Sequence, residues 1–344
     1  MRKFWISLLV LVFAIGVGLG SVATPTDAVA AWKPERPIEF IIQTSPGGGS
    51  DTYARLWIGI IEKYKLSPVP IVPVNMPGGA GAVALAALHG KKGDPHYISP
   101  TLNSIITTAL LQKIPVMYPS EDLTAIAMLM TDPFLLWVNP EKYKSWEDFH
   151  AACKKDKMTV VGTGAKQEDE IQLLALQHAA KCQPFRYVPE KGGGDVAKSV
   201  AGKHADANVN QPSEALPLYP KSLIPILSFQ KTRPAEFKEA PTHHEKGINS
   251  EWGPLLDLDT GLHQMRGIVG PPGMPKEAVD WYVDLFKKVY ETDEWKAFMK
   301  KGAMVPKFLN AQEYQKFLVG FENGHVKVMR DVIGWKLRED LRKR

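Results

Sequence analysis

The chain has 344 residues, a formal net charge of +5 and two cysteines. Two cysteines are too few for a zinc site by themselves, and the nine histidines show no metal-ligand spacing. Basic residues are spread along the chain except in the tail at 338–344, which is typical of a solvated helix end. The composition therefore gives no support for a metal, cofactor or nucleic-acid partner.

The N-terminal segment has the order of a Sec-type signal peptide. A basic start precedes an apolar run at 4–20, and Ala28 and Ala30 form an A-x-A exit. An uncleaved membrane anchor is the alternative, because about 17 apolar residues approach the length that spans a bilayer. We expect residues 1–30 to be a signal peptide cleaved after Ala30, leaving an exported chain long enough for two lobes.

Residues 38–51, IEFIIQTSPGGGSD, predict a strand, a glycine-rich turn and a helix start. Peptide N–H groups at a helix start lack intrahelical partners and lie at the positive end of the helix dipole, so they can bind a carboxylate or phosphate. Ser50 or Asp51 can cap the helix. An ordinary corner between a strand and a helix explains the pattern equally well. The predicted ligand contacts here are Ser45, Pro46, Gly47, Gly48, Gly49, Ser50 and Asp51.

The order of strand, turn and helix recurs in the next part of the chain. A second glycine-rich turn at 75–81 precedes an alanine-rich helix, although close helix packing also explains its small residues. Asn103 and Ser104 begin the following helix, where they can face a ligand or cap the helix, and capping is the simpler explanation. The predicted strands are 38–43, 68–74, 97–99, 123–130 and 134–138, and the predicted helices are 53–64, 82–89 and 105–112. This alternation predicts an α/β fold with a mostly parallel, doubly wound sheet.

The second half contains another turn before a helix, at 162–167. Lys166 is the one cation in these turns, and it can pair with a bound carboxylate or with Glu168 or Asp169. A surface ion pair is the simpler explanation. The predicted strands are 158–164, 185–188, 205–209, 222–230 and 265–269, and the predicted helices are 146–156, 170–180, 195–201, 276–290, 293–300 and 311–333.

Two residue pairs in this half offer further chemistry. Asn210 and Gln211 end a predicted strand and provide both hydrogen-bond donors and acceptors. Cys153 and Cys182 lie near the ends of two predicted helices separated by one strand. In an exported protein, a disulfide and two small buried residues are both open interpretations of this pair.

Together these segments resemble the periplasmic solute receptors of tripartite tricarboxylate transporters, the Bug family. The matching pieces are RPIEFIIQTSPGGGSD, VNMPGGAG, EDLTAIAML, VGTG, VNQPSEALP and GPPGMPKEAVDWY. The resemblance implies the two-lobed, type II periplasmic-binding-protein fold (Venus flytrap), in which each lobe is a mostly parallel doubly wound sheet with helices on both faces. It places lobe 1 at 31–135 and 251–344 and lobe 2 at 136–250, with the ligand cleft between them.

The resemblance also implies where a ligand is held. Backbone donors of the first turn would meet a carboxylate, and Asn210 and Gln211 match a third contact region. The Pro77-Gly78-Gly79 turn matches a family signature that we expect to be more structural. The second-lobe turn supplies Gly162, Thr163, Gly164, Ala165 and Lys166. Here this chain lacks the family's usual Ser/Gly/Thr-rich loop and following histidine, which makes Lys166 a candidate for ligand selectivity.

We therefore expect a periplasmic, monomeric receptor without enzymatic activity or cofactor. It would capture a di- or tricarboxylate or an aromatic acid, with one carboxylate at each lobe's helix start, and deliver it to a two-component membrane permease. An exported α/β hydrolase and a ligand-sensing partner of a membrane kinase are the alternatives; the chain has no G-x-S-x-G motif. Phe134, Trp137 and Trp252 could line the cleft, but core packing is the simpler role.

Overall fold

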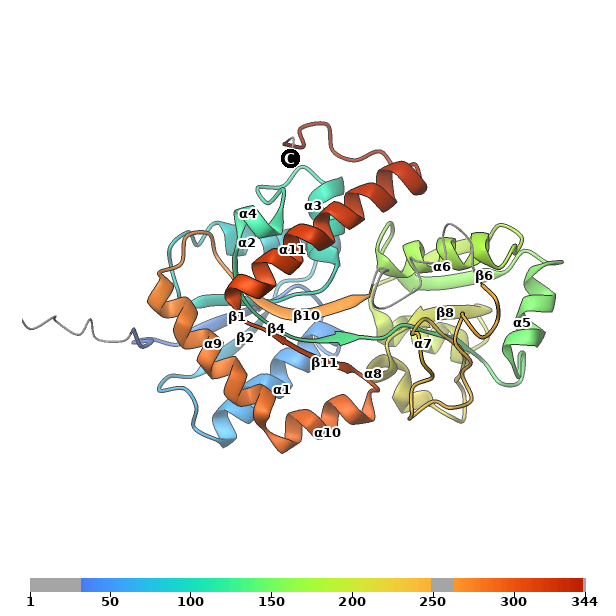
Figure 1. The fold of residues 1–344 in the computed structure, drawn as a ribbon, viewed down its shortest axis with the longest axis horizontal. Coiled ribbons are helices and arrows are strands. Elements are labelled where there is room, and N and C mark those ends of the chain that lie inside the picture. Colours follow the sequence, from blue (N-terminus) through green and yellow to red (C-terminus); the bar gives the residue numbers. More distant parts are fainter. Residues whose placement is uncertain (1–31, 249–262, 343–344) are drawn as a thin grey trace, which may run out of the picture. The chain divides into compact units, whose positions relative to one another are not determined.

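The computed structural model describes residues 32–248 and 263–342, and two β-sheets with helices on both faces organise this part of the chain (Figure 1). The expected signal peptide and Trp252 lie outside the described residues. We call the six-stranded sheet with its helices the first lobe, and the five-stranded sheet with its helices the second lobe. Within the described ranges, no helix is both long enough and apolar enough to cross a membrane.

The first sheet has the strand order β11-β4-β10-β3-β1-β2. β1 pairs in parallel with β2 and β3, whereas β10 pairs antiparallel with β3 and β4. β11 is an edge strand antiparallel to β4. The strands are β1 Ile38–Ile42, β2 Ile71–Asn75, β3 Tyr97–Pro100, β4 Thr124–Asp132, β10 Gln264–Gly270 and β11 Val305–Leu309.

The second sheet has the order β7-β6-β8-β5-β9 and repeats the plan of the first. In each sheet, one strand is antiparallel to both of its neighbours, which are parallel to each other. The chain enters this strand directly after it crosses from the other lobe. This strand is β10 in the first sheet and β5 in the second. The strands are β5 Leu135–Val138, β6 Thr159–Thr163, β7 Arg186–Glu190, β8 Ala207–Asn210 and β9 Ile224–Ser228.

Helices cover both faces of each sheet because alternate strand residues point to opposite faces. In β1, Ile38, Phe40 and Ile42 pack under α1 and α9, whereas Ile41 packs on the other face with α2 and α3. The first-lobe helices are α1 Gly49–Lys63, α2 Ala82–His89, α3 Ser104–Leu111, α4 Pro119–Asp122, α9 Lys276–Glu291, α10 Asp293–Lys301 and α11 Ala311–Val326. The second-lobe helices are α5 Trp146–Cys153, α6 Glu168–Ala179, α7 Gly193–Ala201 and α8 Pro212–Ala215.

The second-lobe core follows the same rule. In β5, Leu136 and Val138 pack with α5 and α6, whereas Leu135 and Trp137 pack with α7. Trp137 and Phe134 are 0% and 1% exposed, so both residues belong to the core. The residues that follow β1, β3, β6 and β8 lie outside these cores and line the space between the lobes.

Candidate functional site

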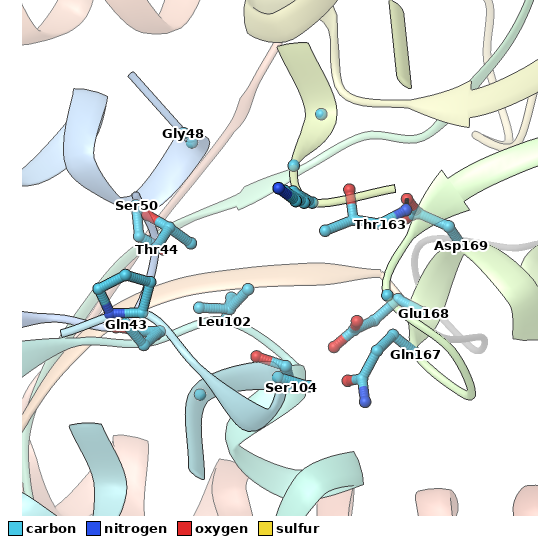
Figure 2. A pocket seen from close by; sticks show the side chains of 18 of the residues that line it. Gln43, Thr44, Gly48, Ser50, Leu102, Ser104, Thr163, Gln167, Glu168 and Asp169 are labelled. Atoms are coloured by element: carbon cyan, nitrogen blue, oxygen red, sulfur yellow. Dashed lines mark hydrogen bonds between the residues drawn. The ribbon is translucent and has the colours of Figure 1, made fainter. Parts of the chain in front are cut away.

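A cavity of about 610 Å³ lies between the two lobes and is lined by residues of both (Figure 2). Its first-lobe lining is Gln43, Thr44, Ser45, Gly48, Gly49, Ser50, Pro77, Gly78, Gly79, Ala80, Gly81, Leu102, Ser104, Gln112, Gln264 and Arg266. Its second-lobe lining is Thr163, Gly164, Ala165, Gln167, Glu168, Asp169, Glu190, Lys191, Gly192, Gly193, Gln211 and Glu214. This volume is in the range of small-molecule binding pockets.

The start of α1 forms an open donor surface on the first-lobe wall. Gly48 is the N-cap residue, and no side chain among the described residues caps this helix, so its first peptide N–H groups remain available. Ser50 is 2% exposed, and its hydroxyl has no hydrogen-bond partner in the described part of the chain; the same holds for the Thr44 hydroxyl. Hydroxyl and peptide donors at a helix start suit an anion.

Asp51 has a structural role in this turn. Its carboxylate accepts hydrogen bonds from the Gly47 N–H at 2.8 Å, from Arg55 Nε at 2.9 Å and from Asn75 Nδ2 at 2.9 Å. Burial alone would raise the pKa of Asp51, but these hydrogen bonds and the charge of Arg55 lower it. The predicted cap by Ser50 or Asp51 is wrong, because the helix begins earlier, at Gly49, and Asp51 instead braces the turn.

The start of α6 gives the second-lobe wall the opposite character. The helix begins two residues before its predicted start, which places Glu168 and Asp169 in its first turn. Asp169 accepts a hydrogen bond from the Thr163 N–H at 2.7 Å. Glu168 is 4% exposed, its carboxyl group is directed into the cavity, and its Oε1 has no hydrogen-bond partner among the described residues (Figure 2).

A third carboxyl group, that of Glu214 on α8, lies between the starts of two helices. A Cβ atom on Gly193, at the start of α7, would lie 2.2 Å from both carboxyl oxygens of Glu214. A Cβ atom on Gly49, at the start of α1, would lie 3.1 Å from Glu214 Oε1 and 3.3 Å from Arg266 Nη2. Glycine at these two positions therefore leaves the room that the Glu214 side chain occupies.

Burial raises the pKa of all three carboxyl groups. It raises the pKa of Glu168 to about 7 and that of Asp169 to about 7, with hydrogen bonds and the charge of Arg266 opposing the shift. It raises the pKa of Glu214 to about 8, against the charge of Arg266 and together with the charges of Asp169 and Asp132. These groups form one electrostatic network across the cavity.

Arg266 on β10 is the buried cation of this network, and the first lobe itself compensates its charge. Its Nη2 and Nε donate to Asp132 Oδ2 at 2.9 and 3.2 Å, and its guanidinium lies 4.4 Å from the centre of the Tyr53 ring. Tyr53 also donates to Asp132 Oδ2 at 2.5 Å. The remaining cavity-lining charges are acidic Glu190 and basic Lys191, so four acidic and two basic residues line the cavity.

Two side-chain contacts join the lobes directly beside the cavity. The Tyr53 and Ser213 hydroxyls lie 3.0 Å apart, and the Thr107 hydroxyl donates to Gln167 Oε1. Tyr53 and Thr107 belong to α1 and α3 of the first lobe, whereas Ser213 and Gln167 belong to the second.

The structure brings together about half of the predicted site residues. Those that line the cavity are Ser45, Gly48, Gly49, Ser50, Ser104, Thr163, Gly164, Ala165 and Gln211. Those outside its lining are Pro46, Gly47, Asp51, Asn103, Gly162, Lys166 and Asn210. Contact of any of these residues with a ligand stays a prediction.

Asn103 and Asn210 serve the backbone instead. The Asn103 amide donates to the His263 carbonyl at 2.6 Å and accepts from the Met265 N–H at 3.0 Å, which ties the start of α3 to β10. The predicted cap at this helix is wrong, because no side-chain cap bond forms there among the described residues. Asn210 Nδ2 donates to the Gly193 carbonyl at 2.9 Å.

Lys166 contacts Trp335 and not Glu168 or Asp169, the two acidic residues with which the sequence suggested an ion pair. Its Nζ lies 5.7 Å from the centre of the Trp335 ring, a cation–π contact with the C-terminal segment. Its peptide N–H donates to Glu170 Oε2 at 2.5 Å. The predicted ion pair with Glu168 or Asp169 is wrong, since both of those side chains are buried in the cavity wall.

Sequence reasoning missed most of the charged residues of the site. Glu168 and Asp169 were considered as ion-pair partners of Lys166 and not as site residues, and Arg266, Asp132 and Glu214 were not singled out. An arginine inside the otherwise apolar run of β10, and an aspartate ending β4, were signals that could have been read. The Pro77–Gly81 turn, expected to be more structural, also lines the cavity.

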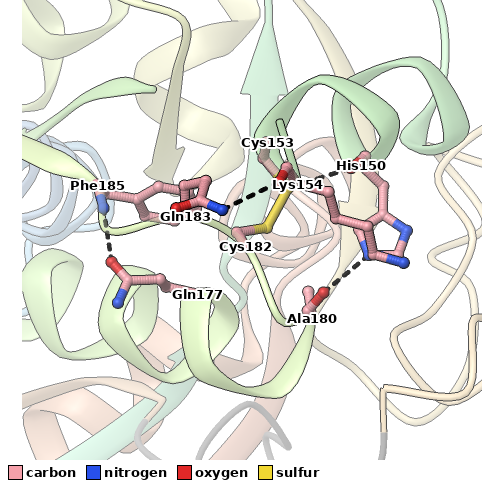
Figure 3. Close-up of a disulfide and its surroundings, with 8 residues drawn as sticks. All are labelled: His150, Cys153, Lys154, Gln177, Ala180, Cys182, Gln183 and Phe185. Carbon is pink, nitrogen blue, oxygen red and sulfur yellow. Dashed lines mark hydrogen bonds between the residues drawn. A yellow bond between two sulfur atoms is a disulfide. The ribbon is translucent and has the colours of Figure 1, made fainter. Parts of the chain in front are cut away.

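Cys153 and Cys182 form a disulfide that joins the end of α5 to the residues that follow α6 (Figure 3). Hydrogen bonds from His150 Nε2 to the Ala180 carbonyl and from Gln183 Nε2 to the Lys154 carbonyl hold the same two segments together. The disulfide lies away from the cavity lining and reinforces the second lobe. In the described ranges, no group of three or more His, Cys, Asp or Glu side chains could hold a metal ion.

Comparison with known proteins defines the class of this chain. The sequence model of the tripartite tricarboxylate transporter family receptor matches residues 62–332. The chain therefore belongs to this receptor family, which confirms the family expected from the sequence. Relatives include the UPF0065 protein in gbd 5'region of Cupriavidus necator, 25% identical and covering 88% of this chain and 90% of its own length, and the protein BugT of Bordetella pertussis, 25% identical over 71% and 76%.

Solved structures confirm the two-lobed fold. The periplasmic binding protein BugD has a TM-score of 0.76 at 18% identity, over 87% of this chain and 98% of its own. MatC of Rhodopseudomonas palustris with bound malate has a TM-score of 0.73 at 21% identity, over 87% and 99%. Rpa4515 of R. palustris with adipate has a TM-score of 0.76 at 17% identity, over 86% and 97%.

Proposed function

We propose that this protein is a periplasmic receptor that captures a small organic carboxylate in the cavity between its lobes. The single observation that carries the proposal is the open start of α1 in the cavity wall. There the Ser50 and Thr44 hydroxyls, which have no partner within residues 32–248 and 263–342, accompany the first peptide donors of the helix. The donors are buried, so a charge-assisted hydrogen bond to a carboxylate is strong there. Two structural neighbours, MatC with bound malate and Rpa4515 with adipate, agree with this ligand class.

The ligand is bound without chemical change and delivered to a two-component membrane permease of the tripartite tricarboxylate type. Membership of the receptor family supports this partner. Closure of the lobes around the ligand would present one joined surface to the permease. We expect a monomer in solution, since a single chain supplies both walls of the cavity.

Isothermal titration calorimetry against a panel of organic acids tests this function. We expect at least one small carboxylate to bind with measurable heat and to raise the melting temperature, because a ligand that binds only the folded state stabilises it. The matched esters, which lack the negative charge, should not bind. Hydrolysis of those esters by the protein, or the absence of heat with every acid, would contradict the proposal.

A further inference from the structure

The two walls of the cavity differ in what they offer a ligand. The first-lobe wall offers donors, the Ser50 and Thr44 hydroxyls with the peptide N–H groups of α1. The second-lobe wall offers carboxyl groups, those of Glu168, Asp169 and Glu214. A ligand carboxylate fits the first wall, but close to the second it would meet charge of its own sign.

The three second-lobe carboxyl groups are not equivalent. Asp169 already accepts the Thr163 N–H at 2.7 Å. Glu214 lies against Gly193 at the start of α7, and burial raises its pKa to about 8, so it holds its proton near neutral pH. Glu168 alone among the three has a buried oxygen, Oε1, without a hydrogen-bond partner in the described part of the chain.

Among the residues that the structure describes, no basic side chain forms an ion pair with Glu168. Arg266 directs two of its nitrogens at Asp132 Oδ2 and stacks its guanidinium over the Tyr53 ring. Lys166 lies over Trp335, and Lys191 is exposed. A buried carboxylate without a partner raises the free energy of the folded protein. A hydrogen-bond donor on the ligand would lower that free energy again.

We propose that the ligand carries a protonated nitrogen as well as a carboxylate, and that Glu168 is the residue that selects for this nitrogen. The carboxylate binds at the start of α1, and the ammonium group donates a charge-assisted hydrogen bond to Glu168 across the cavity. The ligand class is therefore the small amino acids, with the amino group at the α carbon or farther along the chain. This inference rests on the proposed function, since it presumes that a carboxylate is bound.

Selectivity should be pronounced because the cavity is buried. An acid that lacks the amino group leaves Glu168 unpaired, and sites built to hydrogen-bond a ligand group reject analogues that lack that group. We expect each preferred amino acid to bind at least about tenfold more tightly than its amine-free analogue, in line with the strength of a charge-assisted bond.

Calorimetry with matched pairs of probes tests the inference on the full mature chain. The pairs are succinate and aspartate, glutarate and glutamate, and butanoate and 4-aminobutanoate, measured at pH 7.5 with the parent protein, Glu168→Gln and Glu277→Gln. Glu277 also lies in the first turn of a helix, α9, but is exposed, so Glu277→Gln is the matched control. We expect an amino member to be preferred by the parent and by Glu277→Gln. In Glu168→Gln, the ratio should fall below about threefold through loss of amino acid affinity.

The outcomes separate the two proposals. If the amine-free acids bind as well as or better than their partners, the inference on Glu168 is wrong and the carboxylate function stands. If no probe of either kind binds a chain that is folded by circular dichroism, both proposals fail. An amino preference that survives Glu168→Gln also overturns the role of Glu168. Should that variant not fold, the preference of the parent protein decides, because parity between the members of every pair contradicts the proposal.

Discussion

The same local architecture serves opposite purposes on the two sides of the cavity. Both α1 and α6 follow a strand and a glycine-bearing turn, and both begin at the cavity wall. α1 begins with Gly49 and Ser50, so its peptide donors stay open. α6 begins with Glu168 and Asp169, whose carboxyl groups bring negative charge to the place where a ligand carboxylate was expected.

This difference shows that a helix start is an anion site only when its first-turn side chains leave it accessible. A ligand carboxylate at the start of α1 stays a prediction, whereas acidic side chains occupy the first turn of α6. In α6, the acidic residues of the first turn already interact with the positive end of the helix dipole, so it is not available to a ligand carboxylate. The charge balance of the two cavity walls also differs. The first lobe pairs Arg266 with Asp132, whereas the cavity-lining acids of the second lobe have no bonded cation among the described residues.

Removing the compensating cation should have the largest effect. Arg266→Met leaves Asp132, which is fully buried, without its ion-pair partner, and we expect the free energy of unfolding to fall by about 3–5 kcal/mol. Urea denaturation at pH 7 measures it. The double variant Arg266→Met/Asp132→Asn should be more stable than Arg266→Met alone, because the uncompensated charge is gone. A double variant as unstable as the sum of the single losses would contradict the compensation.

The uncompensated wall should make stability depend on pH. Glu168 and Asp169, with pKa values of about 7, and Glu214, with a pKa of about 8, keep their protons in the folded state at pH values where the unfolded chain has released them. Their contribution is therefore fully present below about pH 4 and is lost as the pH rises through 7 to 8. For Glu168 the loss is on the order of 3 kcal/mol.

Thermal unfolding between pH 5 and pH 8.5 checks this dependence. The melting temperature should fall as the pH rises over this range, and Glu168→Gln should flatten the profile by removing one titrating group. The variant should match the parent near pH 5 and exceed its stability near pH 8. A parallel profile for the two proteins would show that Glu168 titrates normally.

Displacing Glu214 should have a smaller effect. In Gly193→Ala, the new methyl group collides with the Glu214 carboxyl group at 2.1–2.2 Å, and we expect a loss of about 1–3 kcal/mol in unfolding free energy. Gly194→Ala is the matched control, because a Cβ there meets nothing within 4 Å. The double variant Gly193→Ala/Glu214→Ala should lose less than the sum of its parts, as expected for contacting residues. Strict additivity would rule out the collision.

The smallest stability change is expected at the donor wall. Ser50→Ala removes a buried hydroxyl without a partner among the described residues, so the free energy of unfolding should change by less than about 0.5 kcal/mol. Carboxylate affinity should nevertheless fall by roughly three- to tenfold, the worth of one hydrogen bond. Calorimetry and melting curves on the same sample separate the two effects. Unchanged affinity would mean that the hydroxyl does not face the ligand.

Local patterns predicted most elements of the fold. The helix at 82–89 begins and ends where the sequence placed it, because its glycine-rich turn and apolar residues are adjacent in the chain. β11, Val305–Leu309, was missed, since it is a short, half-exposed edge strand that depends on pairing with β4 far away in the sequence. Its alternation is too weak to be recognised without that partner.

The donor side of the cavity wall was also predictable, because Ser45 to Ser50 follow one another in the chain, in a turn and the first residues of α1. The charged network was not, since Tyr53, Asp132 and Arg266 meet only after β4 and β10 pair across more than a hundred residues. Glu214 enters from the other lobe and becomes a cavity residue only through the packing of α8 against α7. Such encounters leave no local signature in a single sequence.

The side-chain hydrogen bonds that join the lobes beside the cavity, Tyr53 with Ser213 and Thr107 with Gln167, have a consequence for timing. If a ligand leaves the cavity by separation of the lobes, both bonds must break first, and they would lengthen its residence time without contacting it. Under the proposed function, the permease would have to separate the lobes before the ligand could leave.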